Sequence, residues 1–169
     1  DVYKRQVCDG ASSPPAGEVA ARVSARAVEE VVSGAKADLA RSGELALAVA
    51  GRAMRAALQA VDDAEAEDPE LAGMSSTRTI LLIHERVAVV GHRGDSRAYL
   101  IRGHLSHQLT RDYEPAEVAS ADEDAFDAFS FGVEAGDTLV LCTDGAEEVV
   151  MDASVVRSAG AQPPAVLAS

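Results

Sequence analysis

The sequence is poor in basic residues. Fifteen Lys and Arg residues stand against 28 Asp and Glu residues, which gives a formal net charge of −13. A surface with this excess of negative charge argues against nucleic acid and anionic membranes as partners. It can approach a phosphate group only together with bound cations.

Cysteine and long apolar runs are also scarce. Cys8 and Cys142 both lie in short apolar stretches. We expect reduced, buried thiols in a cytoplasmic chain, with a disulfide between them as the alternative. No apolar run approaches the roughly 20 residues that a membrane span needs, and the N-terminus has no apolar signal core, so we expect a soluble protein.

Tryptophan is absent and aromatic residues make up only 4% of the chain, so alanine and aliphatic side chains must form the core. With 169 residues and 47% hydrophobic content, the chain can bury one sizeable core. We therefore predict a single domain over residues 7–169. Residues 1–6 show no periodicity, and we interpret them as a scar or a disordered start outside the fold.

Two amphipathic helices are predicted in the first half of the chain. The first spans residues 16–33 and the second runs from near Ser42 to about Asp62. Their apolar positions recur at helical spacing and are Val19, Val23, Ala27 and Val31, then Leu47, Met54, Leu58 and Val61. The acidic run over residues 62–69 predicts a solvated loop.

After residue 77 the hydrophobic period changes to that of strands. Residues 79–83 and 86–90 are apolar runs separated by a gap of hairpin length. Residues 98–101 and 105–109 are separated by a turn that contains Gly103. We predict an antiparallel meander with both faces covered, one of them by the helix pair.

The last third of the chain is less regular. Residues 113–128 are acidic and rich in alanine, and they predict a short helix followed by a loop. Residues 138–142 predict a buried strand, and residues 146–151 a helix after it. The tail over residues 155–169 has no clear terminating element.

Three aspartates share one sequence context. Asp9, Asp95 and Asp144 each lie beside a glycine and next to a short apolar run. The glycine permits a sharp turn and leaves a carbonyl oxygen exposed as a further ligand. Carboxylates at strand ends form cages for hard cations such as Mg²⁺ or Mn²⁺. An ordinary turn is the alternative for each aspartate taken alone.

Five segments in order resemble the metal-dependent protein serine/threonine phosphatases of the PPM or type 2C class, and most closely the bacterial members. They are residues 7–10 (VCDG) with 16–21 (AGEVAA), 73–77 (GMSST), 90–100 (VGHRGDSRAYL), 109–112 (LTRD) and 136–145 (GDTLVLCTDG). The resemblance implies an α+β fold, an antiparallel β-sandwich flanked by helix pairs, here incomplete at both ends.

The resemblance also implies a reaction, in which water activated by two Mn²⁺ or Mg²⁺ ions hydrolyses phosphoserine and phosphothreonine. Asp9 would bridge the two metals, and the Gly10 carbonyl would complete one coordination shell. Asp144 would bind one of these ions, and Asp95 together with Asp144 would hold a third, accessory ion. A phosphoprotein is the implied substrate and a Ser/Thr kinase a candidate partner, while the oligomeric state stays open.

The chain departs from the family pattern at several positions. The family's first strand, with its phosphate-binding arginine and an Asn-x-Asp ligand, has no counterpart in residues 1–6. Its final Asp-Asn ligand strand has no counterpart before Ser169. The His that follows Thr-x-Asp is Tyr113. We therefore expect this polypeptide to bind Mn²⁺ weakly and to hydrolyse phosphate esters poorly or not at all. A non-catalytic module that binds a phosphoprotein or a kinase is the alternative.

The polar residues around Asp95 are predicted to have supporting roles. We expect His92 to orient the Gly-Asp turn by hydrogen bonding rather than to act as a general acid. Ser96 lacks a base and an orienting acid at motif positions, so it is not a predicted nucleophile. Arg97 is predicted to be structural, with pairing to a site carboxylate as the alternative. His104 and His107 are predicted to be surface or core residues rather than metal ligands.

Overall fold

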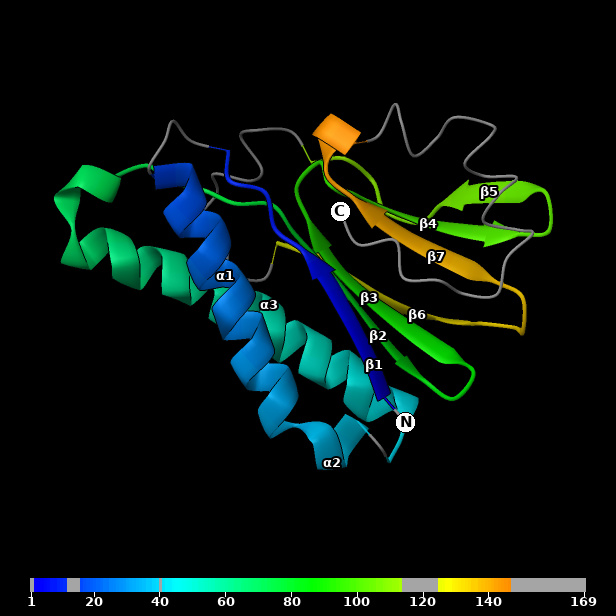
Figure 1. Ribbon diagram of the computed structural model, residues 1–169. Helices are drawn as coiled ribbons and strands as arrows, with labels where there is room; N and C mark the ends of the chain where they lie inside the picture. Colours follow the sequence, from blue (N-terminus) through cyan, green and yellow to red (C-terminus); the bar gives the residue numbers. More distant parts are fainter. Residues whose placement is uncertain (1, 12–15, 40, 114–124, 147–169) are drawn as a thin grey trace.

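The computed structural model describes residues 2–11, 16–39, 41–113 and 125–146, which Figure 1 draws as ribbon. Within them, two antiparallel sheets have the strand orders β1-β2-β3-β6 and β5-β4-β7. The predicted α+β sandwich is confirmed. The elements are β1 (Val2–Val7), α1 (Ala16–Gly34), α2 (Lys36–Leu39), α3 (Gly43–Glu67), η1 (Pro69–Leu71), β2 (Arg78–His84), β3 (Val87–Arg93), β4 (Arg97–Arg102), β5 (Leu105–Gln108), β6 (Asp127–Gly132) and β7 (Thr138–Cys142).

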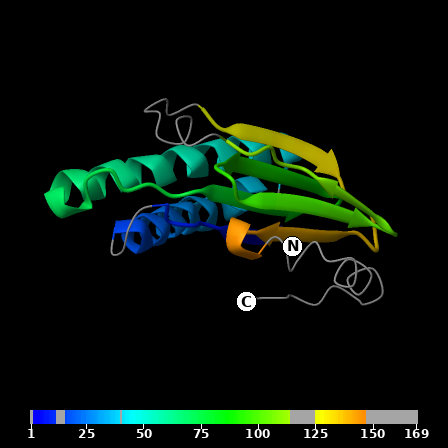
Figure 2. The same cartoon turned by 90° about the horizontal axis from the view of Figure 1, so that it is seen from above.

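The helices α1 and α3 pack against each other and against the four-stranded sheet (Figures 1 and 2). The side chains buried between them are mostly small, so the helix axes can approach closely. Ser42 caps α3, because its hydroxyl accepts a hydrogen bond of 3.2 Å from the Leu45 backbone N–H. No helix in the described ranges is long and apolar enough to cross a membrane.

The helix α3 extends further than the sequence pattern predicted. It continues through the acidic run to Glu67 and is followed by η1, where a solvated loop was expected. Alanine and glutamate both favour helix, so this stretch stays helical although its charges are unfavourable at a helix C-terminus. Asp68 then caps η1 by accepting a hydrogen bond from the Glu70 N–H.

The strand β1 corrects the prediction that the first six residues lie outside the fold. Residues 2–7 pair with β2 along its whole length, from Val2 opposite His84 to Val7 opposite Thr79. The side chains of residues 3–7 are exposed or only partly buried, so the sequence shows no apolar strand pattern here. Pairing with β2 and contacts with α1 stabilise the strand instead. Gln6 Nε2 donates to the Ala25 carbonyl at 2.9 Å, and Lys4 forms an ion pair with Glu29.

The predicted meander is divided between the two sheets. The strands β2 and β3 form one hairpin in the four-stranded sheet, whereas β4 and β5 form another that pairs with β7. The chain changes sheet at the turn between β3 and β4. The second sheet therefore covers the face of β2 and β3 that α1 and α3 leave open. The apolar side chains between the sheets include Leu81, Val90, Phe129, Phe131, Leu139 and Leu141.

The strand β6 was not predicted. The sequence indicated a helix and a loop over residues 113–128, but Asp127 and Ala128 begin a strand that pairs with β3. The residues before it, 114–124, lie outside the described ranges, as does most of the predicted helix over 146–151. Phe129 and Phe131 alternate with the small residues Ala128, Ser130 and Gly132 and pack against the interior, which was the available signal for a strand.

Two buried arginines lie beneath the helices. Arg78 and Arg93 are opposite each other on β2 and β3, and each is 2% exposed. The register places them on the sheet face that carries Ile80, which packs in the core formed with the helices. Burial, followed by the charge of Arg93, lowers the pKa of Arg78 to about 10. The buried Nε of Arg78 has no hydrogen-bond partner among the described residues.

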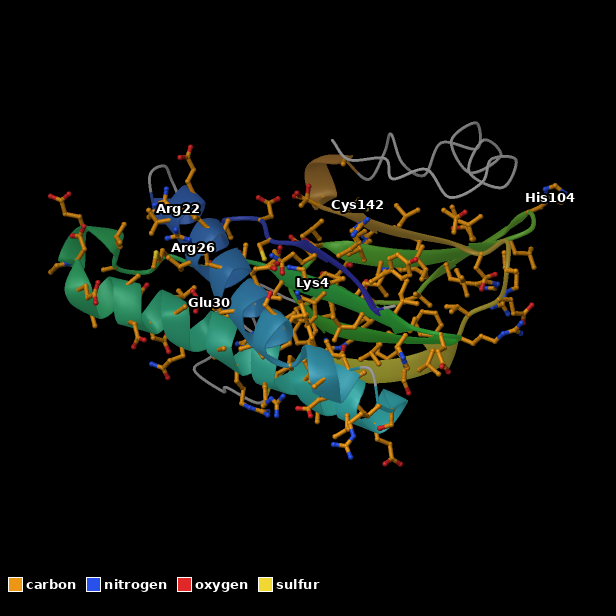
Figure 3. The ribbon with its side chains drawn as sticks, turned by 60° about the horizontal axis from the view of Figure 1, so that its bottom comes forward. Lys4, Arg22, Arg26, Glu30, His104 and Cys142 are labelled. Carbon is orange, nitrogen blue, oxygen red and sulfur yellow. The ribbon has the colours of Figure 1, made fainter. Side chains whose placement is uncertain are left out.

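This arrangement makes Arg78 a costly residue for the fold. Replacing Arg78 by Met removes a buried charge beside a like charge while retaining an unbranched side chain. We expect Arg78→Met to increase the free energy of unfolding by about 1–2 kcal/mol, since it relieves both the desolvation of the Arg78 charge and its repulsion by Arg93. Urea denaturation measures it, with Arg22→Met on the exposed face of α1 as control (Figure 3). A loss of stability in Arg78→Met would contradict this and show that favourable interactions outweigh the cost of burying the Arg78 charge.

Candidate functional site

Three acidic side chains meet where the chain leaves β1, β3 and β7. Asp9 follows β1, Asp95 lies in the turn between β3 and β4, and Asp144 follows β7. In Figure 1, β1 and β7 point toward this same end of the sandwich. The pKa of Asp9 is raised by partial burial, then by the charge of Asp144 and a hydrogen bond with it, and then by the charge of Asp95. The structure thus brings Asp9 and Asp144 into contact and places Asp95 close enough for its charge to act on Asp9.

Thr77 holds the Asp9 segment in place. The Thr77 backbone N–H donates to the Asp9 carbonyl at 2.8 Å, and the Asp9 N–H donates to Thr77 Oγ1 at 3.1 Å. The same hydroxyl lies 2.6 Å from Ser96 Oγ. Thr77 therefore links the segment that carries Asp9 to the turn that carries Asp95. The sequence pattern included Thr77 in a motif but did not indicate this linking role.

Glycine is required at two positions of the site by close approach. A Cβ on Gly10 would lie 2.0 Å from the carbonyl oxygen of Gly17, in the first turn of α1. A Cβ on Gly94 would lie 2.6 Å from the Cβ of Thr77, and Gly94 has a φ of 118°, in the region that favours glycine. Both glycines thus allow neighbouring segments to contact the backbone at the site.

His92 is fully buried below the turn. Its Nδ1 lies 2.9 Å from Thr79 Oγ1, and its Nε2 lies 2.7 Å from the Arg111 carbonyl oxygen. A carbonyl oxygen can only accept, so Nε2 donates and Nδ1 accepts from the Thr79 hydroxyl. Burial lowers the pKa of His92, which favours this neutral ring. His92 is therefore a hydrogen-bonding support for the turn, as predicted.

The turn is also tied to the segment that follows β5. Arg97 donates two parallel hydrogen bonds to Asp112, from Nε at 2.9 Å and from a terminal nitrogen at 2.6 Å. Hydrogen bonding to Arg97 lowers the pKa of Asp112. Ser96 is buried and packed against Thr77, so its hydroxyl has a structural contact.

The two cysteines and the two histidines of the β4–β5 hairpin are not part of the proposed site. Cys8 and Cys142 are free thiols, and Cys142 is buried as predicted, whereas Cys8 is only partly buried. Burial raises the pKa of Cys8 to about 11. His104 and His107 are exposed on the hairpin of β4 and β5, and Figure 3 shows His104 at the hairpin tip, far from α1.

The donor set of the site fits a hard cation in chemistry and charge. Asp9, Asp95 and Asp144 offer only oxygen ligands, and their mutual repulsion is relieved by a cation. Among the described residues, however, no group of three or more His, Cys, Asp or Glu side chains is arranged to hold a metal ion. The three carboxylates thus interact through their charges but are not arranged as a complete metal cage.

Comparison with known proteins identifies the family of this sandwich. Residues 4–164 match the family model described as Protein phosphatase 2C. The chain belongs to this family. Protein phosphatase PhpP of Streptococcus pneumoniae is 30% identical over 114 residues, which are 53% of this chain and 46% of the relative. The chain spans about half the length of the curated relatives it matches.

Solved structures of phosphatase 2C relatives have the same fold. The serine/threonine phosphatase PstP/Ppp of Mycobacterium tuberculosis has a TM-score of 0.74 and 26% identity, covering 94% of this chain and 77% of that one. The catalytic domain of PstP in complex with two manganese ions has a TM-score of 0.74 and 25% identity, covering 95% and 80%. Phosphatase Stp1 of Staphylococcus aureus, at 22% identity and a TM-score of 0.75, covers 98% and 74% and supports the fold alone.

The contact at Gly10 yields a test of the site's construction. We expect Gly10→Ala to lower the free energy of unfolding by about 2–3 kcal/mol, because a backbone carbonyl occupies the space of the new methyl group. Thermal or urea unfolding measures the change. Gly34→Ala at the end of α1 is the matched control, since its Cβ would meet nothing within 4 Å. Equal stability of Gly10→Ala and the parent would contradict the close approach of α1.

Repulsion among the carboxylates predicts a pH dependence in the absence of cations. Because the folded pKa of Asp9 lies above the ordinary value of 3.8, the stability linked to its protonation is fully present below that value. It is lost as the pH rises through the folded pKa. In EDTA, Asp9→Asn should therefore lose less stability than the parent between pH 4 and neutrality. The difference should be a few tenths of a kcal/mol, since Asp9 is partly exposed.

The measurement is thermal unfolding in EDTA across that pH range. Glu30→Gln is the control, because Glu30 is exposed on α1, away from the cluster (Figure 3). Parallel pH profiles for Asp9→Asn and the parent would contradict the repulsion.

Proposed function

We propose that this chain is a domain of a metal-dependent protein serine/threonine phosphatase that hydrolyses phosphoserine and phosphothreonine in a phosphoprotein. The observation that carries the proposal is the convergence of Asp9, Asp95 and Asp144 at one end of a phosphatase 2C sandwich. The manganese complex of the related PstP domain supports Mn²⁺, or the similar Mg²⁺, as the cofactor. We further propose a cytoplasmic location, with a Ser/Thr kinase as a candidate partner.

The proposed roles of the oxygen donors are those that the resemblance to the family's motifs implies. Asp9 and Asp144 would hold a pair of divalent cations, with the Gly10 carbonyl as a further oxygen ligand. Asp95 together with Asp144 would hold an accessory ion. When bound, such cations would supply an activated water and neutralise phosphate charge. The net charge of −13 supports this reading, because the bare acidic site would repel the substrate.

The activity test uses the protein that contains this chain, produced from its whole reading frame. We expect Mn²⁺-dependent turnover of p-nitrophenyl phosphate and of a phosphothreonine peptide, abolished by EDTA. Asp144→Asn should lower turnover by about a hundredfold or more, since metal sites lose 10–100-fold even when only supporting residues are changed. Glu30→Gln is the charge-matched control. Turnover that needs no divalent cation, or that persists in Asp144→Asn, would contradict the proposal.

A non-catalytic binding module is the second candidate. It is favoured by the absence of a complete metal-binding group among the described residues. In that case the phosphopeptide would bind without turnover, and its affinity would be the same in Mn²⁺ and in EDTA. Calorimetry with the peptide therefore separates the two candidates.

The weak Mn²⁺ binding and poor turnover expected of residues 1–169 alone also remain a prediction. Calorimetry that gave a micromolar Mn²⁺ affinity, together with turnover that vanished in Asp144→Ala, would refute it.

A further inference from the structure

Asp95 is an exposed residue between buried neighbours. Gly94 is buried and Ser96 has no exposed surface, whereas the Asp95 side chain projects into solvent. An exposed carboxylate has little packing of its own, so the backbone of the turn must set its position. Whatever holds residues 94–97 thus determines where this carboxylate can meet a cation.

The segment over residues 110–113, here called the clasp, supplies that support. Each of its four residues bonds a different residue around the turn. The Ala98 N–H donates to Thr110 Oγ1 at 3.0 Å, and His92 Nε2 donates to the Arg111 carbonyl at 2.7 Å. The Tyr113 N–H donates to the Gly94 carbonyl at 2.9 Å. The fourth contact is the ion pair of Asp112 with Arg97.

These contacts hold residues that come before and after Asp95 in the sequence. Tyr113 bonds the residue just before Asp95, and Asp112 bonds Arg97, two residues after it. A shift of the turn along the strands would break bonds on one side or the other. The clasp therefore restricts the backbone at the base of the exposed carboxylate.

The ion pair of Arg97 and Asp112 is the side-chain part of the clasp that can be changed without opening the core. Its two side chains are 23% and 43% exposed. Exposed ion pairs contribute little to global stability. The two parallel hydrogen bonds nevertheless fix orientation, and lysine cannot reproduce them.

We propose that Arg97 and Asp112 form a positioning pair, which holds the turn so that Asp95 can bind the accessory divalent cation. This proposal rests on the proposed function, because the accessory ion belongs to that site. The pair acts through the backbone of residues 94–97 and does not itself bind the cation. Arg97 also occupies both carboxylate oxygens of Asp112, which keeps this neighbouring acid from competing with Asp95.

A second ion pair in the same strand provides a matched control. Arg102, at the other end of β4, donates two parallel hydrogen bonds to Asp137, at 2.8 and 2.7 Å. Arg97→Lys and Arg102→Lys therefore remove the same bonding pattern while keeping the charge, one near Asp95 and one at the far end of the strand. Asp112→Asn removes the partner's charge with almost no change in shape.

The first measurement is a Mn²⁺ titration of the full-length protein by calorimetry, combined with thermal unfolding in EDTA. We expect Arg97→Lys and Asp112→Asn to weaken the weakest class of Mn²⁺ sites about tenfold, as supporting residues of metal sites do. The tighter class and the unfolding temperature should change little. Arg102→Lys should leave all Mn²⁺ affinities unchanged. Equal weakening in Arg102→Lys, or none in Arg97→Lys, would overturn the proposal.

The second measurement is amide hydrogen exchange of the metal-free protein, which tests the clasp independently of the metal site. Arg97→Lys and Asp112→Asn should exchange faster at residues 94–97 than the parent, whereas Arg102→Lys should not. Unchanged exchange in both clasp variants would refute the positioning role. If the clasp variants exchange faster but the parent binds no Mn²⁺, the clasp restrains the turn only structurally. The proposed function and the role assigned to Asp95 are then wrong.

Discussion

The linkage through Thr77 is the constraint on which the acidic cluster depends. This threonine is only 5% exposed, and its backbone N–H and hydroxyl both bond the Asp9 backbone. Its side chain also contacts Ser96 and occupies the space beside Gly94. One small residue with a hydroxyl group thus joins the end of β1 to the turn where the chain changes sheet. Valine would keep the shape but leave the partly buried N–H of Asp9 without its acceptor.

The scarcity of aromatic side chains has a structural consequence at the same place. The helix α3 buries Ala46, Ala50, Ala53 and Ala57 in the core that it shares with α1 and the sheet. Ala20 of α1 is buried against Val61 of α3 and Met74. Such small side chains let α1 and α3 approach each other closely. The first turn of α1 therefore reaches the Asp9 segment and leaves room only for glycine at position 10. The composition of the core thus affects the shape of the site through the close approach of α1 to Gly10.

Local patterns predicted α1, most of α3 and the two hairpins, because helical and strand periods are visible within a few residues. The same holds for the three carboxylates, since an aspartate beside glycine after an apolar run is a local signal. Features that depend on contacts distant in sequence were not predicted. Residues 2–7 become a strand only because β2 and α1 lie beside them, and the meander divides because Gly94 permits the turn between the sheets. No local signal in residues 110–113 indicates that all four bond residues in or beside the turn.

Charge pairing separates structural acids from candidate ligands in a chain with 28 acidic residues. Asp112 and Asp137 each accept two hydrogen bonds from an arginine, which lowers their pKa values and occupies both oxygens. Asp9 has the opposite environment, because burial and then like charges raise its pKa. A carboxylate surrounded by like charge gains the most from a cation, whereas one saturated by a guanidinium gains little. The arginines at the two ends of β4 thus hold Asp112 and Asp137 in structural ion pairs, whereas the environment of Asp9 favours a divalent cation.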